Sequence, residues 1–319
     1  MQVLRHYSPV PPELAHGVVV LGNFDGVHRG HQAVVGEGMT AARAAGAPLL
    51  VLTFEPHPVS VLRPDAPPFR LTPFRVKTHY LEALGLDGLV VLHFDQALSA
   101  MPAEGFVREV LVEGLKIRRV VVGYDFCFGK GRGGNATLLQ AMGAELGFDV
   151  SVVQPAKGGD GELFSSTRIR EHLKAGRPGH AAALLGRPFE IEGRVEPGDQ
   201  RGRLMGFPTA NLSLGEQLRP AYGVYAARAG VAAEDGTESW HDAVANLGVR
   251  PTVDGRKELF EVNLIGFSGD LYGRHMRVAL IEFLRPEQRF DGLEALKAQI
   301  SKDRDAAIRI LQTRRAGAS

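Results

Sequence analysis

Two histidines stand three residues apart in a glycine-bent segment near the N-terminus, GNFDGVHRGH at residues 22–31. An apolar, β-branched run, Gly17 to Leu21, precedes this segment, and an alanine-rich run, Gln32 to Ala45, follows it. The pattern predicts a strand, a turn and a helix N-terminus, where backbone N–H groups and the helix dipole attract anions. His28 and His31 can then face one bound group and donate hydrogen bonds to phosphate oxygens. The segment predicts a triphosphate-binding loop, although two surface histidines at a helix start would give the same motif.

A second candidate phosphate site lies in the segment FSSTRIR, residues 164–170. Its hydroxyl groups come just before an expected helix, and Arg168 falls in the first turn of that helix. Hydroxyl and guanidinium donors in this place favour phosphate binding. The structural alternative is plain N-capping by Ser165 or Ser166.

A glycine-rich loop, GYDFCFGKGRGGN at residues 123–135, follows a predicted strand and carries two phenylalanines and two cations. Aromatic rings beside a phosphate-binding crevice suit a flat heterocycle. A mobile loop without a ligand would explain the glycines equally well.

Residues 198–211 form a second glycine-rich segment, GDQRGRLMGFPTAN. Three glycines at a spacing of four precede a Thr-x-Asn there: Gly198, Gly202, Gly206, Thr209 and Asn211. Glycines let a backbone approach phosphates closely, and hydroxyl and amide oxygens are hard ligands suited to Mg²⁺. The segment resembles a kinase site without a Walker sequence, or else a turn at the corner of a barrel.

Glu261 lies in the apolar run Leu259 to Ile265. A carboxylate among such neighbours is a candidate general base. The alternative for a lone glutamate in an alternating strand is a side chain that faces solvent.

Length and composition predict two globular domains in a chain of 319 residues with a formal net charge of +1. So small a charge argues against an extended nucleic-acid surface, which needs a basic excess. The single cysteine, Cys127, excludes an intrachain disulfide framework and fits a reducing cytoplasm. We expect neither a membrane span nor a signal peptide, because long apolar runs are missing. An oligomer is compatible with the sequence but does not follow from it.

The elements that must position these residues differ between the two halves of the chain. Up to about residue 155, strand-length apolar runs alternate with helical stretches, which predicts an α/β domain with a parallel sheet and a crevice at its carboxyl edge. The predicted strands are Gly17 to Leu21, Leu49 to Phe54, Leu89 to Phe94, Arg119 to Gly123 and Phe148 to Val153. Polar segments follow the first four.

Past residue 185 the β-rich runs follow one another without helices between them, which predicts an antiparallel barrel or sandwich. These runs are Phe189 to Val195, Gly223 to Ala229, Trp240 to Leu247, Leu259 to Ile265 and Met276 to Phe283. A helix from Leu293 to Leu311 closes this half. A helical connector, Ile169 to Leu185, is expected to break at Gly176, Pro178 and Gly179. We place the domain boundary near Gly186.

Together these segments resemble the family of bifunctional bacterial FAD synthetases, in which a riboflavin kinase is fused to an FMN adenylyltransferase. The resemblance covers most of the chain and rests on the order and spacing of motifs that are individually weak. In the first half they are GNFDGVHRGHQ at 22–32, TFEPHP at 53–58, GYDFCFGKGRGGN at 123–135 and SSTRIR at 165–170. In the second half they are GRPF at 186–189, GFPTANL at 206–212, GVYA at 223–226, NLGVRPT at 246–252 and GDLYG at 269–273.

The resemblance implies a Rossmann-like nucleotidyltransferase domain at residues 1–185 and a flavokinase β-barrel with a C-terminal helix at residues 186–319. It implies that ATP and Mg²⁺ serve two reactions, riboflavin to FMN and FMN to FAD. Adenylyl transfer would use groups that stabilise phosphate charge: Asn23, His28, Gly30, His31, Ser166, Thr167 and Arg168. Asp125, Phe126 and Phe128 would hold the flavin. In the kinase, Glu261 would be the base, Thr209 and Asn211 would bind Mg²⁺ and phosphate, and the glycines Gly198, Gly202 and Gly206 would cradle ATP.

Four positions depart from the family pattern. Asn135 stands where an acidic residue is usual, Cys127 where arginine is more frequent, and Asn263 and Gly266 where histidine and aspartate are more frequent. None is an expected catalytic position, so the departures bear on flavin contacts and barrel packing.

Two rival interpretations remain at the level of sequence. The N-terminal motifs also occur in nucleotidyltransferases that adenylylate other phosphorylated cofactor precursors. The C-terminal barrel could be a non-catalytic flavin- or nucleic-acid-binding module. A barrel that keeps Thr209, Asn211 and Glu261 argues against both.

Overall fold

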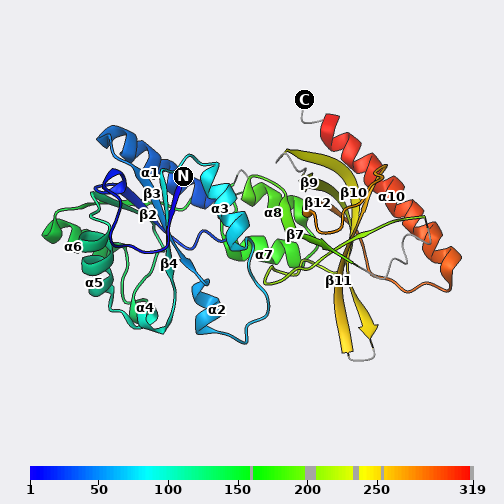
Figure 1. Ribbon diagram of the computed structural model, residues 1–319, viewed down its shortest axis with the longest axis horizontal. Helices are drawn as coiled ribbons and strands as arrows, with labels where there is room; N and C mark the ends of the chain where they lie inside the picture. Colours follow the sequence, from blue (N-terminus) through cyan, green and yellow to red (C-terminus); the bar gives the residue numbers. More distant parts are fainter. Residues whose placement is uncertain (159–160, 198–205, 233–236, 253–254, 317–319) are drawn as a thin grey trace. The chain divides into compact units, whose positions relative to one another are not determined.

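The computed structural model describes residues 1–158, 161–197, 206–232, 237–252 and 255–316 (Figure 1). The chain divides into two compact units. One consists of Met1–Pro67 and Thr72–Ser165, and the other of Pro68–Leu71 and Ser166–Ser319. The predicted domain limits, 1–185 and 186–319, assign one expected activity to each segment of the chain. This assignment stays a prediction.

The first unit is built on a six-stranded sheet in the order β1-β4-β3-β2-β5-β6, with every pair parallel. The strands are β1 (Gln2–Leu4), β2 (Val18–Leu21), β3 (Leu49–Glu55), β4 (Gly88–His93), β5 (Arg119–Gly123) and β6 (Asp149–Val153). The five predicted strands are confirmed, with ends that shift by one residue at most. Strand β1 was not predicted, because its three residues are too short and too exposed to make a pattern.

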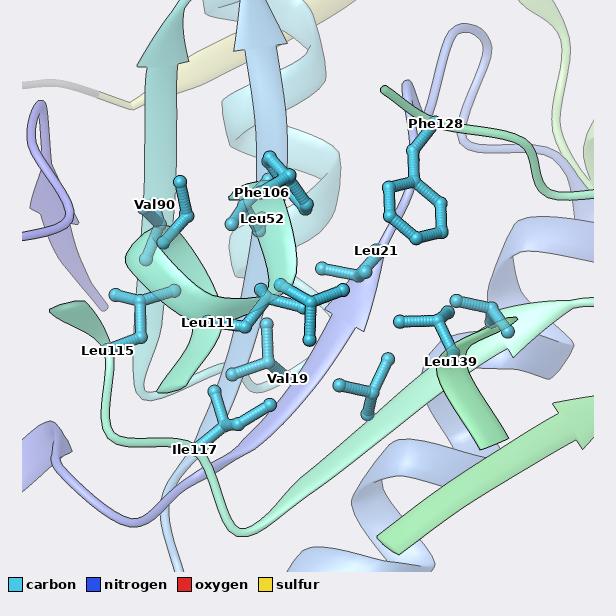
Figure 2. Packing of buried hydrophobic residues seen from close by; sticks show 14 of the residues in the cluster. Val19, Leu21, Leu52, Val90, Phe106, Leu111, Leu115, Ile117, Phe128 and Leu139 are labelled. Carbon is cyan, nitrogen blue, oxygen red and sulfur yellow. The ribbon is translucent and has the colours of Figure 1, made fainter. Parts of the chain in front are cut away.

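Both faces of this sheet are covered, which explains why its strands are continuous apolar runs rather than alternating ones. The helices and helical turns of the unit are η1 (Pro12–Leu14), α1 (Arg29–Ala45), α2 (Pro58–Leu62), α3 (Phe74–Glu82), α4 (Gln96–Ala100), α5 (Ala103–Gly105), the π-helix η2 (Phe106–Gly114), η3 (Lys130–Arg132) and α6 (Ala136–Leu146). Helices α1 and α3 pack on one face, and η2 and α6 on the other. Figure 2 shows the hydrophobic core between the sheet and the helices η2 and α6, in which Val19 and Leu52 of the sheet pack near Leu111 of η2.

The second unit contains a closed barrel in the order β10-β11-β8-β7-β12-β9, with antiparallel pairs. Its strands are β7 (Phe189–Glu196), β8 (Ala210–Leu212), β9 (Gly223–Ala232), β10 (Glu238–Thr252), β11 (Gly255–Leu264) and β12 (His275–Pro286). The predicted barrel is confirmed, with the short β8 as an addition. The connector is also broken as expected, into α7 (Ser166–Lys174) and α8 (Pro178–Leu185).

The C-terminal helix α10 (Leu293–Ala316) lies along the outside of the barrel (Figure 1). Ala307 and Leu311 on this helix are buried against Ala226 of β9. A carboxylate on the same helix, Asp303, forms a two-pronged ion pair with Arg285 of β12, at 3.0 Å and 2.7 Å. Apolar burial and this ion pair together fix the helix on the barrel.

Two candidate active sites

The loop between β2 and α1 has a backbone conformation that side-chain-bearing residues rarely adopt. Phe24, Gly26 and Val27 have φ angles of 51°, 91° and 42°. Left-handed backbone at a non-glycine residue costs about 1–3 kcal/mol and persists only where the surroundings fix it. Phe24 and Val27 are each 1% exposed and pack in the core beneath α1. The loop is therefore held in one shape by burial as well as by the polar contacts described below.

The two histidines of this loop form one unit at the N-terminus of α1. His28 is the N-cap residue, and its Nδ1 accepts a hydrogen bond from the backbone N–H of His31 at 3.3 Å. The two rings stack with centroids 3.7 Å apart. Because Nδ1 accepts, the neutral His28 ring carries its proton on Nε2, which is a hydrogen-bond donor. Gly30 makes room for this ring, since a Cβ there would lie 3.0 Å from Cε1 of His28.

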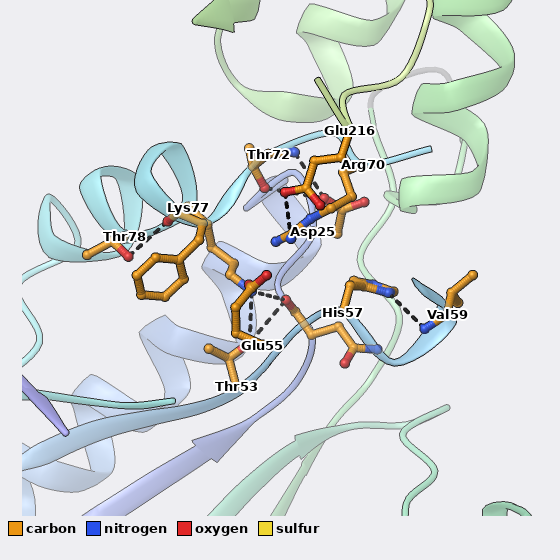
Figure 3. Close-up of polar contacts among 12 residues, drawn as sticks. Asp25, Thr53, Glu55, His57, Val59, Arg70, Thr72, Lys77, Thr78 and Glu216 are labelled. Atoms are coloured by element: carbon orange, nitrogen blue, oxygen red, sulfur yellow. Dashed lines mark hydrogen bonds and ion pairs between the residues drawn. The ribbon is translucent and has the colours of Figure 1, made fainter. Parts of the chain in front are cut away.

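A buried carboxylate fixes the middle of the loop. Asp25 is 4% exposed and accepts hydrogen bonds from the backbone N–H and the hydroxyl of Thr72, at 3.0 Å and 3.3 Å (Figure 3). The backbone N–H of Gly26 donates to the same Thr72 hydroxyl at 2.9 Å. Thr72 therefore fixes Asp25 and Gly26, which lie in the middle of the left-handed turn.

A buried lysine lies at the start of the same loop. Lys77 of α3 is 1% exposed, and its Nζ donates to Thr53 Oγ1 at 3.2 Å and to the carbonyl oxygen of Asn23 at 3.4 Å (Figure 3). The carboxylate oxygen Oε2 of Glu55 lies 3.6 Å from Lys77 Nζ and supplies the opposite charge. The sequence analysis did not identify Lys77. The available signal was its place on the apolar stripe of α3, next to Val76 and four residues before Leu81.

The second predicted phosphate segment begins α7. Ser166 is partly buried, Thr167 and Arg168 are exposed, and the guanidinium of Arg168 pairs with Glu171 at 3.0 Å. These three residues belong to the second compact unit. Their grouping with His28 and His31 stays a prediction.

The predicted flavin loop joins β5 to α6. Asp125 is exposed and Phe126 is half-buried, whereas Phe128 is 6% exposed and packs in the core against Phe106. The rings of Phe126 and Phe128 stack with centroids 5.8 Å apart. Asn135 at the end of the loop caps α6 through its side-chain oxygen, which accepts from the N–H of Leu138 at 3.0 Å. The buried ring of Phe128 thus supports the loop by packing against Phe126. Of the three predicted flavin-binding residues, Asp125 and Phe126 are accessible to a ligand.

In the barrel, three polar side chains lie in one row across three strands. Glu261 of β11 stands directly opposite Asn211 of β8 on one side and Asn246 of β10 on the other. Side chains paired in this way share a face of the sheet. All three are partly exposed and alternate with buried residues such as Val262, so the row lies on the outer face of the barrel. Asn246 was not identified from sequence, although an amide in the middle of an apolar strand was the available signal.

The segment before β8 approaches the same row. Thr209 directly precedes β8, and the amide of Asn263 donates a hydrogen bond to the carbonyl oxygen of Pro208 at 2.7 Å. Gly206 is exposed and has a left-handed φ of 84°. Gly198 and Gly202 lie outside the described residues. Gly266, another departure from the family pattern, has a left-handed φ of 72° in the turn after β11.

The described part of the chain contains neither a metal-binding cluster nor a membrane-spanning helix. It holds no group of three or more His, Cys, Asp and Glu side chains placed to bind a metal. None of its helices is long and apolar enough to cross a membrane.

Two protein-family models match this chain, one in each half. The FAD synthetase family model matches residues 10–168, and the riboflavin kinase model matches residues 185–311. The bifunctional riboflavin kinase/FMN adenylyltransferase of Escherichia coli strain K12 is 43% identical over 301 residues, which cover 94% of each chain. The protein of the same name from Bacillus subtilis strain 168 is 36% identical over 315 residues, 97% of each chain.

A solved structure has the same fold along nearly the whole chain. It is described as a macrolide-efflux protein from Streptococcus pneumoniae and matches with a TM-score of 0.84 at 30% identity, over 96% of this chain and 97% of its own. Family models thus match both halves of the chain, and relatives match nearly its full length. The chain belongs to the family of bifunctional riboflavin kinase/FMN adenylyltransferases.

Proposed function

We propose that this chain carries out the two reactions of its family with two separate sets of residues. Riboflavin would be phosphorylated to FMN at the barrel row of Asn211, Glu261 and Asn246. FMN would be adenylylated to FAD at the loop that carries His28 and His31. The observation that supports this division is that one compact unit holds the stacked histidines and the other holds the row of Asn211, Glu261 and Asn246.

In adenylyl transfer, a phosphate oxygen of FMN attacks the α-phosphorus of ATP, the bond to the bridging oxygen breaks, and pyrophosphate leaves. The nucleophile is already anionic, so no strong base is needed and catalysis depends on positioning and on stabilisation of charge. The stacked imidazoles at the α1 N-terminus would donate hydrogen bonds to phosphate oxygens, with Asn23 and Gly30 beside them.

The flavin of the adenylyl-transfer site would lie against the loop between β5 and α6. Phe126 offers a partly exposed ring for an isoalloxazine, and Asp125 offers an exposed acceptor. Phe128 would act beneath them, because its ring is buried and supports that of Phe126.

In the kinase reaction, the 5′-hydroxyl of riboflavin attacks the γ-phosphorus of ATP and ADP leaves. This nucleophile must lose a proton, and Glu261 would accept it. The carboxylate is partly exposed on the outer face of the barrel, where a substrate can reach it. Asn211 and Asn246 flank it and would orient the substrates.

The oxygen donors of the barrel fit Mg²⁺, a hard cation that prefers oxygen ligands and is usually shared with substrate phosphates. Thr209 offers a hydroxyl and Asn211 an amide oxygen, at the start of β8 and in the row that contains Glu261. These two residues would hold the ion, which neutralises phosphate charge when bound. We place both reactions in the cytoplasm, which suits a chain with a single cysteine.

Two variants of the full chain test this assignment of residues to the two reactions. Glu261→Gln keeps the size of the side chain and removes the base, and should lower FMN formation on the order of 100-fold or more. Its conversion of added FMN to FAD should stay normal. The double variant His28→Asn/His31→Gln should do the reverse, with a loss of about 100-fold or more in FAD formation. Asparagine is chosen at position 28 because it still caps a helix.

Chromatography of flavins after incubation with riboflavin or FMN, ATP and Mg²⁺ measures both reactions. Equal loss of both activities in either variant would contradict the assignment of residues to reactions. Unchanged FAD formation in the histidine double variant would exclude the loop as the site of adenylyl transfer.

A further inference from the structure

We propose that Lys77 is a positioning residue for adenylyl transfer, which acts through the backbone carbonyl of Asn23. The inference rests on the proposed place of the ATP phosphates at residues 22–31. Lys77 itself is buried and would not touch the substrates.

The burial of this ammonium group is the first argument. Lys77 is 1% exposed, and a charged group in that environment is very costly unless it is paired and hydrogen-bonded. The carboxylate of Glu55, which is 19% exposed, lies 3.6 Å from Lys77 Nζ and supplies an opposite charge. Lys77 also donates hydrogen bonds to Thr53 and to the carbonyl oxygen of Asn23 in the loop between β2 and α1.

The second argument is that two donors converge on one carbonyl oxygen. The Oγ1 of Thr53 donates to the carbonyl of Asn23 at 3.2 Å, and Lys77 Nζ donates to the same oxygen at 3.4 Å. Thr53 is fully buried and also accepts from Lys77 at 3.2 Å. The backbone of Asn23 is therefore fixed from below, while its side chain is exposed at the end of β2.

The third argument is the strain in the residues that follow. Phe24 and Val27 have left-handed φ angles of 51° and 42°, which the chain adopts only if its surroundings hold it there. Lys77 and Thr53 hold the loop at Asn23. Thr72 holds it at Asp25 and Gly26. Two polar side chains on one short segment, Thr72 and Lys77, thus clamp the loop that leads into the His28 cap.

Loss of the clamp should displace the loop, and with it the groups that meet the phosphates. Small displacements of positioned groups cost on the order of 100-fold in rate. The alternative is that Lys77 only balances the charge of Glu55. In that case removal of both charges together would restore normal activity.

The test compares Lys77→Met with Lys77→Met/Glu55→Gln in the full chain. Methionine keeps the unbranched shape and removes the ammonium group. We expect kcat for FAD formation to fall about 10- to 100-fold and the KM for ATP to rise in both variants. Riboflavin phosphorylation by the same preparations should be unchanged. A smaller folded fraction would lower kcat alone, so the KM for ATP separates misplacement of the loop from loss of folded protein.

A second pair of variants keeps the proposal testable if Lys77→Met does not fold. Thr53→Val removes the hydroxyl with little change in shape and should also raise the KM for ATP, whereas Thr53→Ser should restore it. An unchanged KM for ATP in Thr53→Val, or full recovery in Lys77→Met/Glu55→Gln, would overturn the proposal. If His28→Asn/His31→Gln loses FAD formation while the Lys77 and Thr53 variants keep normal constants, only this inference fails. If the histidine variant keeps FAD formation, the assignment of the site itself fails.

Discussion

Glu258 on β11 holds two neighbouring side chains through one carboxylate. Arg219 donates to both of its oxygens, at 3.2 Å and 2.8 Å, and the hydroxyl of Tyr222 donates at 2.5 Å. The hydrogen bonds from Arg219 lower the pKa of Glu258 below its usual value. Burial, and then the hydrogen bond to Glu258, raise the pKa of Tyr222 to about 12. The cluster joins the segment before β9 to β11 of the same barrel.

The stability of the barrel should therefore depend on pH through Glu258. A lowered folded-state pKa contributes stability above the unfolded value of 4.5, and that stability is lost as the pH falls through the folded pKa. We expect Glu258→Gln to lower the free energy of unfolding at neutral pH by about 0.5–1 kcal/mol, because the site is partly exposed. The difference from the parent should vanish in acid. Denaturant titrations monitored by the fluorescence of Trp240 measure it.

Glu294 provides a matched control for this experiment. Its side chain is 86% exposed, and it pairs with Lys297 on the surface of α10 at 3.2 Å. Glu294→Gln should leave stability nearly unchanged at every pH, because such exposed pairs contribute little. A difference for Glu258→Gln that stays constant from neutral to acid pH would contradict the role given to its charge.

At the scale of elements, the C-terminal helix shows how one buried side chain holds a long segment. Leu311 is 2% exposed and packs with Ala307 against β9. Leu311→Ala leaves a cavity and should cost about 2–4 kcal/mol of stability. Gln312→Ala, next to it on the exposed side of α10, should cost no more than about 0.5 kcal/mol. Equal effects in chemical denaturation would show that α10 is not anchored through this contact.

The elements that were predicted from sequence are those whose burial leaves a pattern. Strands β2 to β5 are apolar runs because the sheet is covered on both faces, whereas β11 of the barrel alternates because only one of its faces is fully buried. The π-helix η2 was not predicted, because its bonding from residue i to i+5 leaves no distinct spacing in a segment of nine residues. Strand β8 has three residues and was missed for its length.

Among the residues of the candidate sites, those with local contacts were predicted and those with long-range contacts were missed. His28 and His31 were predicted because their partners are local, within one helical turn. Lys77 and Asn246 were missed, because their contacts join segments far apart in the chain. Lys77 contacts Asn23, which stands 54 positions earlier in the chain, and Asn246 lies opposite Glu261 only in the register of β10 with β11. Long-range contacts of this kind become visible only in the folded molecule.

At the scale of the whole molecule, two compact units each have their own core and their own candidate site residues. The barrel row belongs entirely to the second unit, and the histidine pair with Lys77 entirely to the first. A change in one set should therefore leave the other set intact. The intermediate between the reactions, FMN, would be the only link that catalysis requires.

This independence predicts that two damaged chains can complement each other. Glu261→Gln alone, and His28→Asn/His31→Gln alone, should each form almost no FAD from riboflavin. An equal mixture should form FAD after a lag, because FMN released by the histidine variant reaches the intact loop of the Glu261 variant through solution. The lag should shorten as both proteins are concentrated, since transfer between chains is bimolecular. If the mixture makes no FAD although the Glu261 variant converts added FMN, the intermediate must instead pass within one chain.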